Sequence, residues 1–558
     1  MLNNSTKVAR LIVEQLLTAG VQHAVLAPGS RSAPLAIALL QAQEAGLVSV
    51  HVRIDERDAG YLALGLAKAT GSIVPVVVTS GTAVANLMPA VVEGFQSGLP
   101  LVLLTADRPE VARGNSTPQT INQENIFGNF VKGSIDTSIN DFVVSDLREL
   151  LNLAQSIHCG PVHLNIQFEL PLVPAEDELH WQPKLDLADV SANRFSVNPL
   201  KSAQSFAFSD NGLILAGDIR DQAEAQAVGE LATLLNWPIV CEPTSNLHSH
   251  SHALAHGILL ITSQQLPAPA AIITAGTVGL SRPILKLLKE TGDYTALHLS
   301  GNGPELPDPV QNASRILDFV PTTPAHADSA WLDLWQTADQ KVGNIINDYL
   351  QSESLSGPSA AVTVWSHAAE PDHLMVAASW SVRHLESFAP KRAGLTVVGN
   401  RGANGIDGLI STAWGAALAS AGRTYLLMGD VAFLHDIGAL AIPEGEDHPD
   451  LTIVVLDNDG GGIFNQLEQG EPQYANYFEK AFGTPHGKDL WQISESFGFA
   501  STRVTTRTEL SEALNRSGKI PGVHIVICLT GSRANENQLL NQIRTKVTAE
   551  LSTPANSN

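Results

Sequence analysis

Short apolar runs rich in Val, Ile and Leu alternate with helix-length segments along the whole chain. In the first third, the runs cover residues 23–27, 48–54, 73–79, 101–105 and 162–166. Helix-length segments separate them, for example at 57–69 and 83–96, and an amphipathic segment at 5–19 precedes the first run. Such alternation is typical of parallel sheets, whose strands are buried on both faces by crossover helices. The sequence therefore predicts the α/β fold class with a doubly wound sheet.

The same alternation returns twice. A second group of runs lies at 213–218, 237–241, 271–275 and 296–299, and a third at 396–399, 425–428, 451–456 and 524–528. Polar segments without periodicity separate the groups at 171–199 and 351–359 and are predicted linkers. We therefore expect three domains, each a mainly parallel doubly wound sheet, at residues 1–180, 200–345 and 360–558. The polar tail after about residue 551 is predicted to be disordered.

The composition fits three domains of ordinary size. The chain has 558 residues, of which 44% are hydrophobic and 16% charged, so each domain can bury its own core. No run of about 18 apolar residues occurs, and Arg10 and Glu14 interrupt the N-terminal segment. We therefore expect no membrane contact, no signal peptide and a cytoplasmic location. Cys159, Cys241 and Cys528 are far apart and odd in number, which favours buried reduced thiols over disulfides.

The formal net charge of −23 argues against nucleic acid as a partner and repels anions in general. A site for an anionic substrate must therefore gather its own cations locally. Binding of a nicotinamide cofactor is disfavoured, because no Gly-x-Gly-x-x-Gly follows a predicted strand. The α/β fold class does not decide function, so function has to be argued from the motifs at the strand ends.

Two polar turns follow consecutive apolar runs in the last third of the chain. Gly429, Asp430 and Val431 come directly after one run, and Asn458 and Gly460 follow the next. Open α/β sheets bind ligands at the carboxyl ends of their strands, so both turns are expected to face one crevice. A carboxylate, an amide oxygen and a backbone carbonyl near Gly460 are hard oxygen ligands that suit Mg²⁺, with phosphate oxygens and water completing the shell. A Gly-Asp pair alone also fits an ordinary turn.

Glu56 follows the apolar run at 48–54 and precedes a helix-length segment. From this position it is either a first-turn acid favoured by the helix dipole or a functional carboxylate. Downstream, the segment at 79–87 consists mainly of small residues and turns from a strand into a helix. Small residues at such a turn suit the close approach of a flat ring.

The spaced Gly-Asp and Asn motif and the distant Glu56 together resemble the thiamine-diphosphate decarboxylase superfamily across essentially the whole chain. The resemblance implies a pyrimidine-binding, a central and a diphosphate-binding domain, with thiamine diphosphate and Mg²⁺ or Mn²⁺ as cofactors. It implies that Glu56 promotes the imino tautomer of the aminopyrimidine, and that Ile406 is the apolar residue between the two cofactor rings. It also implies metal binding by Asp430, Asn458 and Gly460, and further cofactor contacts at Gly429, Val431, Ile463 and Phe464.

Six separated motifs resemble one family of this superfamily more closely. They lie at residues 27–35, 55–57, 79–83, 104–109, 400–408 and 460–464. The family is that of the 2-succinyl-5-enolpyruvyl-6-hydroxy-3-cyclohexene-1-carboxylate synthases of menaquinone biosynthesis. The resemblance implies a transferase that decarboxylates 2-oxoglutarate and adds the resulting four-carbon carbanion to isochorismate in a conjugate addition.

Both implied substrates are dicarboxylates, and arginine binds a carboxylate in a bidentate fork while staying charged. The resemblance implies substrate contacts by Arg31, Arg108, Arg282, Arg383 and Arg401, with Ile463 and Phe464 as an apolar wall. It implies that catalysis involves Glu56, Arg31, Arg383 and Arg401 together with the hydrogen-bonding residues Ser30, Gln119 and Ser379. Taken singly, each arginine also fits a surface or strand-end position. Arg31 and Arg401 lie in the clearest motifs, and Arg282 lies in the weakest.

Several positions depart from the pattern of the family. Asp457 and Asp459 stand where relatives often have asparagine, so either could add charge near the metal or point to solvent. A proline precedes Gln119 where an amide is often found, which leaves the contact of that amide open. Neither His384 nor His435 shows an obvious proton-transfer role, and both are expected to be structural.

Glu56 and Asp430 are predicted to lie in different domains yet to contact opposite ends of one cofactor. The resemblance implies a homodimer, or a homotetramer built as a dimer of dimers, with each site at a subunit interface. Two other functions stay open: another 2-oxoacid decarboxylase or carboligase of the superfamily, and a regulatory protein that binds a nucleotide without catalysis. The arginines favour a dicarboxylate over pyruvate, and the combination of Glu56, Asp430 and Asn458 argues against the regulatory protein.

Overall fold

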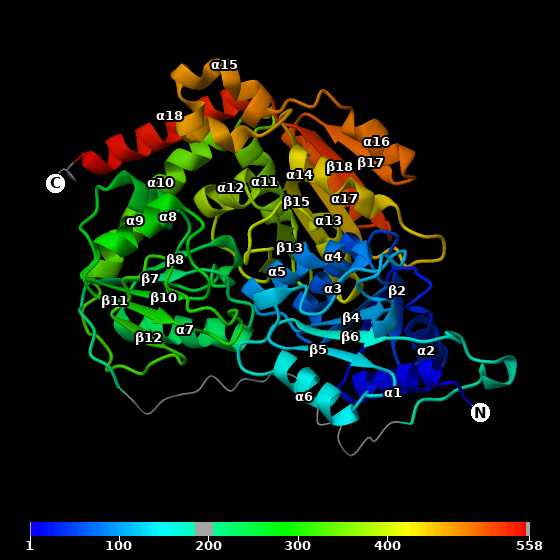
Figure 1. Ribbon diagram of the computed structural model, residues 1–558. Coiled ribbons are helices and arrows are strands. Elements are labelled where there is room, and N and C mark those ends of the chain that lie inside the picture. The colour runs from blue at the N-terminus through cyan, green and yellow to red at the C-terminus, as the bar shows by residue number, and fades with distance from the viewer. Residues whose placement is uncertain (1, 185–204, 554–558) are drawn as a thin grey trace.

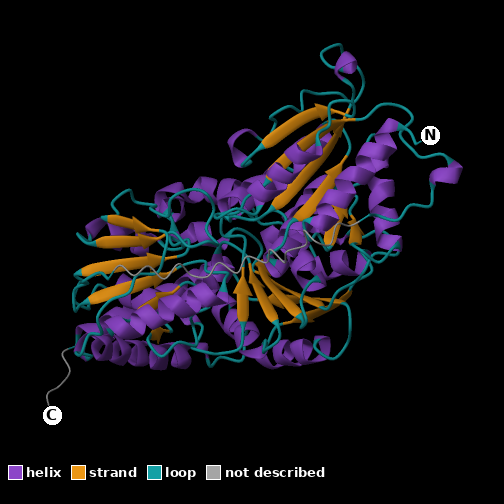
Figure 2. Cartoon of the chain, turned by 90° about the horizontal axis from the view of Figure 1, so that it is seen from below, coloured by secondary structure: helices purple, strands orange, loops and turns teal. Residues whose placement is uncertain are grey.

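Three six-stranded sheets follow one another along the chain in the computed structural model, which describes residues 2–184 and 205–553 (Figure 1). All strand pairings within these sheets are parallel. Figure 2 shows the sheets as separate fans of strands with helices packed between them. The predicted α/β class with parallel sheets is therefore confirmed.

The first sheet has the strand order β2-β1-β3-β4-β6-β5. Its strands are β1 (His23–Leu26), β2 (Ser49–Val52), β3 (Val74–Val78), β4 (Leu101–Asp107), β5 (Ser134–Ser138) and β6 (Val162–Gln167). The helices around it are α1 (Asn4–Thr18), α2 (Ala33–Glu44), α3 (Glu56–Thr70), α4 (Thr82–Asn86), α5 (Met88–Gln96) and α6 (Val144–Ala154). Each predicted run in this part of the chain forms a strand. The edge strand β5 was not predicted, because its sequence carries a single large apolar residue, Ile135.

The helix-length segment predicted at 83–96 is two helices, α4 and α5, which meet at Leu87. Pro89 lies in the first turn of α5. Proline has no backbone N–H and fits the start of a helix but not its interior, so the chain ends one helix and begins another here. By contrast, α3 is continuous, because Asp55 caps its first turn through the backbone N–H of Arg57 and Gly71 ends it in the left-handed conformation.

The central sheet has a different order, β12-β11-β10-β7-β8-β9. Its strands are β7 (Gly212–Ala216), β8 (Ile239–Cys241), β9 (Ala253–Leu254), β10 (Ala271–Ala275), β11 (Tyr294–Leu297) and β12 (Arg315–Leu317). The accompanying helices are α7 (Gln222–Leu235), α8 (Gly257–Ser263), α9 (Arg282–Glu290) and α10 (Ala330–Leu350). Renumbered from its own first strand, this is the 3-2-1-4-5-6 order of dinucleotide-binding folds. The short edge strands β9 and β12 were not predicted.

The third sheet repeats the topology of the first, with the order β14-β13-β15-β16-β18-β17. Its strands are β13 (His373–Val376), β14 (Thr396–Val398), β15 (Thr424–Gly429), β16 (Leu451–Asp457), β17 (Ala500–Val504) and β18 (Val523–Leu529). The helices are α11 (Gly357–His367), α12 (Trp380–Phe388), α13 (Leu409–Leu418), α14 (Asp430–His435), α15 (Ala475–Phe478), α16 (Leu490–Ser496), α17 (Arg507–Ser517) and α18 (Arg533–Ser552). The predicted linker at 351–359 is shorter than expected, because Ser356 caps α11 and the helix begins at Gly357.

One apolar core joins the first and third sheets. It extends from β3 through Leu62 on α3 and Trp414 on α13 to β15. The two helices cross where both carry glycine: a Cβ at Gly65 would lie 2.0 Å from the Thr412 carbonyl oxygen, and a Cβ at Gly415 would lie 2.2 Å from that of Leu62. Glycine at both positions allows the close backbone approach. The carboxyl ends of the two sheets are therefore held in a fixed relation within one chain.

Further expectations concern thiols, the membrane and the chain ends. All three cysteines are free; Cys241 and Cys528 are buried as expected, whereas Cys159 is only half-buried. Within the described residues, no helix combines the length and apolar character that a membrane span requires. The predicted linker at 171–199 is described only up to residue 184, and the predicted disordered tail lies outside the described residues from 554 onward.

Candidate active site

A cavity of about 390 Å³ opens at the carboxyl ends of β13, β15 and β16. Its wall gathers residues from four separate predicted motifs of the third sheet. The predicted site residues that line it are Ser379, Arg383, Arg401, Ile406, Gly429, Asp430, Val431, Asn458, Gly460, Ile463 and Phe464. Parallel strands bring their carboxyl ends to one edge of the sheet, which explains why residues so distant in sequence meet here.

The Asp430 carboxylate organises one end of this cavity. It follows β15 at the start of α14, where its Oδ1 accepts a hydrogen bond from the backbone N–H of Val431 at 2.7 Å. Its Oδ2 accepts backbone N–H bonds from Asn458 at 3.2 Å and Gly460 at 2.8 Å. Asp430 thereby ties the end of β15 to the turn after β16. A Cβ at Gly460 would lie 2.1 Å from the Gly483 carbonyl oxygen, so this turn requires glycine.

Asn458 supplies an unused ligand atom at the same end. Its Oδ1 is buried and has no hydrogen-bond partner among the described residues. Leaving a buried acceptor unpaired costs free energy, so such atoms in native proteins call for an explanation such as a bound ion. An amide oxygen beside a carboxylate matches the ligands that Mg²⁺ and Mn²⁺ prefer. The residues present therefore fit a divalent cation bound to a diphosphate.

Sequence reasoning did not find His486, which lies in this cluster. Its Nε2 is 3.3 Å from Asp430 Oδ2 and 3.7 Å from Asp457 Oδ1, and the hydrogen bond to Asp430 raises the pKa of His486. Burial, together with the charge of Asp430, raises the pKa of Asp457 to about 6. The ligand atoms of these three residues lie within 4.8 Å of one another. His486 follows no predicted strand, so no sequence pattern pointed to it.

The two aspartates whose role stayed open have different positions. Asp457 faces Asp430 and His486 and lies in the cluster described above. Asp459 is half-exposed, and its Oδ1 accepts the backbone N–H groups of His486 at 2.9 Å and Gly487 at 2.8 Å. Asp457 therefore adds charge near the predicted metal ligands, whereas Asp459 holds the loop that carries His486.

Two arginines, Arg401 buried and Arg383 half-buried, form the other end of the cavity. The Arg383 guanidinium donates to the carbonyl oxygens of Ser379 at 2.9 Å and Leu280 at 2.8 Å, and burial lowers its pKa. Arg401 is buried beside it, and its side chain forms no hydrogen bond with the described residues. Neither guanidinium is neutralised by a direct ion pair among the described residues. This end is therefore suited to carboxylates, which guanidinium groups bind strongly.

The loop that carries Arg401 is held by the first sheet. Glu93 on α5 accepts the backbone N–H groups of Gly402 at 3.0 Å and Ala403 at 2.6 Å, and Lys68 on α3 donates to the Gly399 carbonyl at 2.8 Å. Lys68 and Glu93 are buried and lie 3.9 Å apart. Neither residue was predicted, because each lies within a helix whose sequence only indicated packing.

His384 and Glu536 also line the cavity. His384 Nε2 lies 2.7 Å from Glu536 Oε1, and both side chains are buried. The second oxygen of Glu536 has no partner among the described residues. His384 was expected to be structural, and the structure places it in the cavity wall. His435, the other histidine expected to be structural, is exposed at the end of α14.

The predicted site residues of the first sheet form a separate group. Ser30, Arg31, Glu56, Arg108 and Gln119 follow the strands of that sheet or lie in its connecting loops, and none is among the described residues that line the cavity. Glu56 is half-buried at the first position of α3, where its Oε2 accepts a hydrogen bond from Asn86 Nδ2 at 3.2 Å. Within one chain, the carboxylate predicted for the pyrimidine and the ligands predicted for the metal therefore do not share this cavity.

Arg31 and Gln119 are fixed by backbone contacts. The Arg31 guanidinium donates to the Phe168 carbonyl at 2.9 Å, and its pKa is lowered by burial and by the nearby charge of Arg108. Gln119 has a positive φ of 57°, and its Nε2 donates to the Ser80 carbonyl at 3.1 Å. The contact of Gln119 that the sequence left open is therefore to the backbone at the end of β3.

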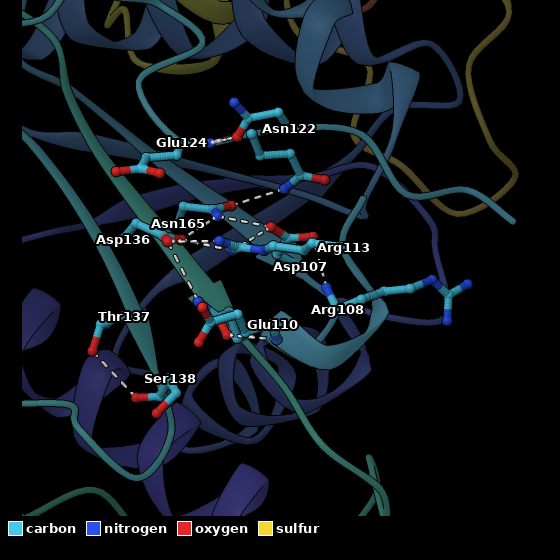
Figure 3. Close-up of polar contacts among 12 residues, drawn as sticks. Asp107, Arg108, Glu110, Arg113, Asn122, Glu124, Asp136, Thr137, Ser138 and Asn165 are labelled. Atoms are coloured by element: carbon cyan, nitrogen blue, oxygen red, sulfur yellow. Dashed lines mark hydrogen bonds and ion pairs between the residues drawn. The ribbon is translucent and has the colours of Figure 1, made fainter. Parts of the chain in front are cut away.

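The backbone at Arg108 is held by a buried polar network (Figure 3). Asp107 Oδ1 accepts the N–H of Arg108 at 2.7 Å, and Arg113 bridges Asp107 Oδ2 at 2.6 Å and both oxygens of Asp136 at 2.7 and 2.8 Å. Asn165 Nδ2 donates to the same two carboxylates. Hydrogen bonding to Asp136 raises the pKa of Arg113. Figure 3 shows the Arg108 guanidinium pointing away from this network, so its charge is left free.

Arg282 does not line the main cavity, although its charge lies near that of Arg383. It is exposed at the first position of α9 and lines a separate cavity of about 510 Å³, together with Trp335. Leu280, two residues earlier, lines the main cavity. Its role in binding substrate stays a prediction.

Comparisons with known proteins agree with this division into two groups. Residues 6–126 match the family model described as "thiamine pyrophosphate enzyme, N-terminal TPP binding domain", and residues 377–528 match the corresponding "C-terminal TPP binding domain". Thiamine pyrophosphate is thiamine diphosphate, so these matches support the predicted cofactor. The first match covers Glu56, and the second covers Asp430 and Asn458.

Relatives of similar length match nearly the whole chain. Proteins of Saccharopolyspora erythraea, Thermobifida fusca and Kineococcus radiotolerans are 37%, 37% and 38% identical to it over 94%, 93% and 95% of this chain. The matches cover 95%, 95% and 96% of the relatives, and each relative is named 2-succinyl-5-enolpyruvyl-6-hydroxy-3-cyclohexene-1-carboxylate synthase. The chain therefore belongs to the family of 2-succinyl-5-enolpyruvyl-6-hydroxy-3-cyclohexene-1-carboxylate synthases, which are thiamine-pyrophosphate-dependent enzymes.

Proposed function

We propose that the chain decarboxylates 2-oxoglutarate and adds the four-carbon unit to isochorismate, releasing CO₂, in menaquinone biosynthesis. One observation carries the choice of substrates: the buried Arg401 and the half-buried Arg383 lie in the wall of the cavity whose other end holds Asp430 and Asn458. Placing two guanidinium groups in a cavity wall costs desolvation free energy, and a bound anion would offset this cost. Because the chain as a whole carries a net charge of −23, these local cations are what would attract an anion to the cavity. Both proposed substrates carry two carboxylates.

The cofactor end of the proposed site uses residues that fit it. Asp430, Asn458 and the Gly460 carbonyl would hold Mg²⁺ or Mn²⁺ beside the diphosphate group of the cofactor. Gly429 and Val431 contact the cofactor beside them, and Ile406 supports its rings. When bound, thiamine diphosphate would supply a nucleophilic carbon and a sink for the negative charge that decarboxylation leaves.

The substrate end uses charge and exclusion of water. Arg383 and Arg401 bind carboxylates of the substrates, and Ser379 offers a hydrogen bond beside them. Ile463 and Phe464 cover the cavity with apolar surface, which keeps water from the reacting carbon and strengthens the attraction between arginine and carboxylate. Binding and orientation of two dianions is thus the main task of the protein groups.

We also propose that a second copy of the chain completes each site, in a homodimer or a dimer of dimers. The separation of Glu56 from the cavity supports this assembly. The first sheet of one subunit would bring Glu56, Arg31, Ser30, Gln119 and Arg108 to face the cavity of its partner. In that position, Glu56 would hold a proton at the aminopyrimidine, and Asp430 of the other chain would hold the metal. A two-fold axis then creates two equivalent sites.

An assay with both substrates tests the reaction. The protein is incubated with thiamine diphosphate, Mg²⁺, 2-oxoglutarate and isochorismate, and CO₂ release and isochorismate loss are followed together. We expect one CO₂ for each isochorismate consumed, and no isochorismate loss when pyruvate replaces 2-oxoglutarate. Turnover of pyruvate at a similar rate would instead assign another 2-oxoacid carboligase of the superfamily. Replacement of Mg²⁺ by Mn²⁺ in the same assay ranks the two ions.

A further inference from the structure

Two buried carboxyl groups lie behind the arginine end of the cavity and are not used by the proposed reaction. Glu242 directly follows β8 and is 2% exposed, and Glu386 on α12 is 4% exposed. Neither is among the described residues that line the cavity. Both contact the loop at 279–281, whose residues Gly279 and Leu280 do line it.

The contacts of the two carboxyl groups differ. Glu242 Oε1 accepts the backbone N–H groups of Gly279 and Leu280, each at 2.8 Å. Among the described residues, Glu386 Oε2 is bonded only to the hydroxyl of Ser281, at 2.5 Å. The other oxygen of each group, Glu242 Oε2 and Glu386 Oε1, is buried without a partner among the described residues. Two backbone donors stabilise an ionised carboxylate at Glu242, whereas Glu386 receives much less support for a charge.

Repulsion between like charges adds to this difference between the two carboxyl groups. Two carboxylates buried near one another do not both ionise readily, so one of them retains a proton to higher pH. Burial, with the charge of Glu242 next, raises the pKa of Glu386 to about 8. Burial also raises the pKa of Glu242, and Arg401 and the two backbone donors oppose this effect. The contacts and the charges therefore agree that Glu386 is the protonated member near pH 7.

Several charged and titratable groups surround Glu242 and Glu386. Arg383 and Arg401 face Glu386 and Glu242, Arg282 lies near Arg383, and Asp218 lies near Glu242. The other titratable groups on the elements around α12 are His248, His256 with Asp339, and the buried pair of His384 and Glu536. Burial lowers the pKa of His248 to about 4 and also lowers that of His256, so neither gains charge above pH 7.

The protonation state of Glu386 therefore determines the net charge beside the cavity. Asp218 and Arg282 carry opposite charges that offset each other, so with Glu386 neutral the charges of Arg383 and Arg401 exceed that of Glu242 by one. With Glu386 ionised, the two carboxylates cancel the two guanidinium groups. An excess positive charge attracts a dianion into the cavity, and its loss removes that attraction.

We propose that Glu386 is held protonated by its burial and by the nearby charge of Glu242, and that its neutrality leaves the Arg383 and Arg401 pair a net positive charge that selects a dicarboxylate substrate. This inference rests on the proposed function for the identity of the substrate. Glu386 is in this sense a positioning and specificity residue that acts through the arginines and through Ser281.

The first test is the pH dependence of the KM for 2-oxoglutarate, measured at saturating isochorismate on the holoenzyme. As pH rises through the pKa of Glu386, the proton is lost and the affinity for the dianion falls. We expect KM to rise on the order of tenfold between pH 7 and 9, with a much smaller change in kcat, because one charge is removed at close range. In Glu386→Gln, which cannot ionise, the ratio of KM at pH 9 to KM at pH 7 should approach one.

Two variants sharpen this test. Glu224→Gln is the matched control. Glu224 on α7 is also 4% exposed, and burial raises its pKa, but it accepts the backbone N–H of Ser300 outside the cavity. In this variant, KM for 2-oxoglutarate should therefore still rise with pH. Ser281→Ala removes the only hydroxyl that stabilises an ionised Glu386, so it should move the rise of KM to higher pH. An unchanged pH profile in both Glu386→Gln and Ser281→Ala overturns the proposal.

Infrared difference spectroscopy provides a readout that does not depend on turnover. At pH 7, the spectrum of wild type minus Glu386→Gln should contain the carbonyl stretch of a protonated carboxylic acid, and this band should vanish by pH 9.5. Absence of the band at pH 7 overturns the proposal even if the enzyme is active. If 2-oxoglutarate is not turned over at all, the proposed function fails, while the band still decides whether Glu386 holds a proton. A Glu386→Gln variant that does not fold can be replaced by Ser281→Ala, whose band should persist to higher pH.

Discussion

Single residues at the strand ends carry most of the proposed chemistry, and Glu56 is the first of them. It is half-buried at the start of α3, with Asn86 as its side-chain partner. A first-turn acid would contribute only to helix stability, by about 0.3–1 kcal/mol. A carboxylate that holds a proton at the cofactor would contribute to the rate, so the two roles are separable by experiment.

Glu56→Gln should leave the protein folded and able to bind thiamine diphosphate, and should lower kcat by about a hundredfold or more, the scale of acid–base assistance. Cofactor affinity is measured by titration in near-ultraviolet circular dichroism, and kcat by CO₂ release. Asp146→Asn is the matched control, since Asp146 is a first-turn acid on α6 and should affect stability alone. Near-normal turnover of Glu56→Gln would reduce Glu56 to a first-turn acid.

The unpaired oxygen of Asn458 offers a cleaner test of the metal site than Asp430, because Asp430 also holds two turns of the backbone. Asn458→Ala should weaken the binding of Mg²⁺ and thiamine diphosphate together, by at least about tenfold, while thermal stability without cofactor stays the same or rises. Asn458→Asp keeps an oxygen at this position and should retain binding. Metal-dependent cofactor affinity that survives Asn458→Ala would exclude Asn458 as a ligand.

At the scale of elements, the crossing of α3 and α13 determines how the first and third sheets meet. Gly65 and Gly415 allow the backbones to touch, and Glu93 and Lys68 then reach the loop that carries Arg401. The start of α13 is fixed by Asp436, directly after α14, which accepts the backbone N–H groups of Gly408, Ile410 and Ser411. One helix pair therefore connects the core to the position of a substrate arginine.

Gly415→Ala should lower the free energy of unfolding by about 1–3 kcal/mol, because the new methyl group meets backbone that cannot move aside. Gly292→Ala is the control: Gly292 is exposed and a Cβ there meets nothing within 4 Å, so the expected change is within about 0.5 kcal/mol. Urea denaturation followed by tryptophan fluorescence measures both. Equal effects of the two substitutions would mean that the helices can separate without cost.

At the scale of the whole molecule, the predicted site is divided between two regions of one chain. The cavity of the third sheet holds Asp430 and Asn458, and Glu56 lies elsewhere on the first sheet. The core shared by α3 and α13 fixes this separation within the chain. A second subunit is therefore the proposed source of the missing half.

Mixing two inactive variants tests the shared site. Glu56→Ala and Asp430→Ala subunits, each inactive alone, should regain activity after subunit exchange, because a mixed dimer has one doubly defective and one intact site. Random pairing should restore about one quarter of wild-type activity, since half of the dimers are mixed and each has one good site of two. Mixing Glu56→Ala with Glu56→Gln subunits serves as the control and should restore none. No recovery despite demonstrated exchange would contradict the shared site.

The sequence by itself determined the elements and the polar residues at their ends. Apolar runs at 425–428 and 451–456 predicted buried strands, and Asp430 and Asn458 after them predicted a site, because both patterns are local and parallel strands align their carboxyl ends. Local reasoning was wrong at Leu87, where Pro89 in the next turn divides a predicted helix. It also missed the edge strands β5, β9, β12 and β17, which are short or have few apolar residues, and the interior strand β13.

Only the tertiary structure decided which distant side chains meet. His486 reaches Asp430 from a loop, Glu93 holds the Arg401 loop from another sheet, and Glu242 and Glu386 approach one short segment from two different units. No periodicity or spacing predicts these contacts, because they arise from the packing of helices against sheets far apart in sequence. Burial then alters the pKa values of the groups that packing brings together, and for this reason the electrostatic character of the site belongs to the folded molecule.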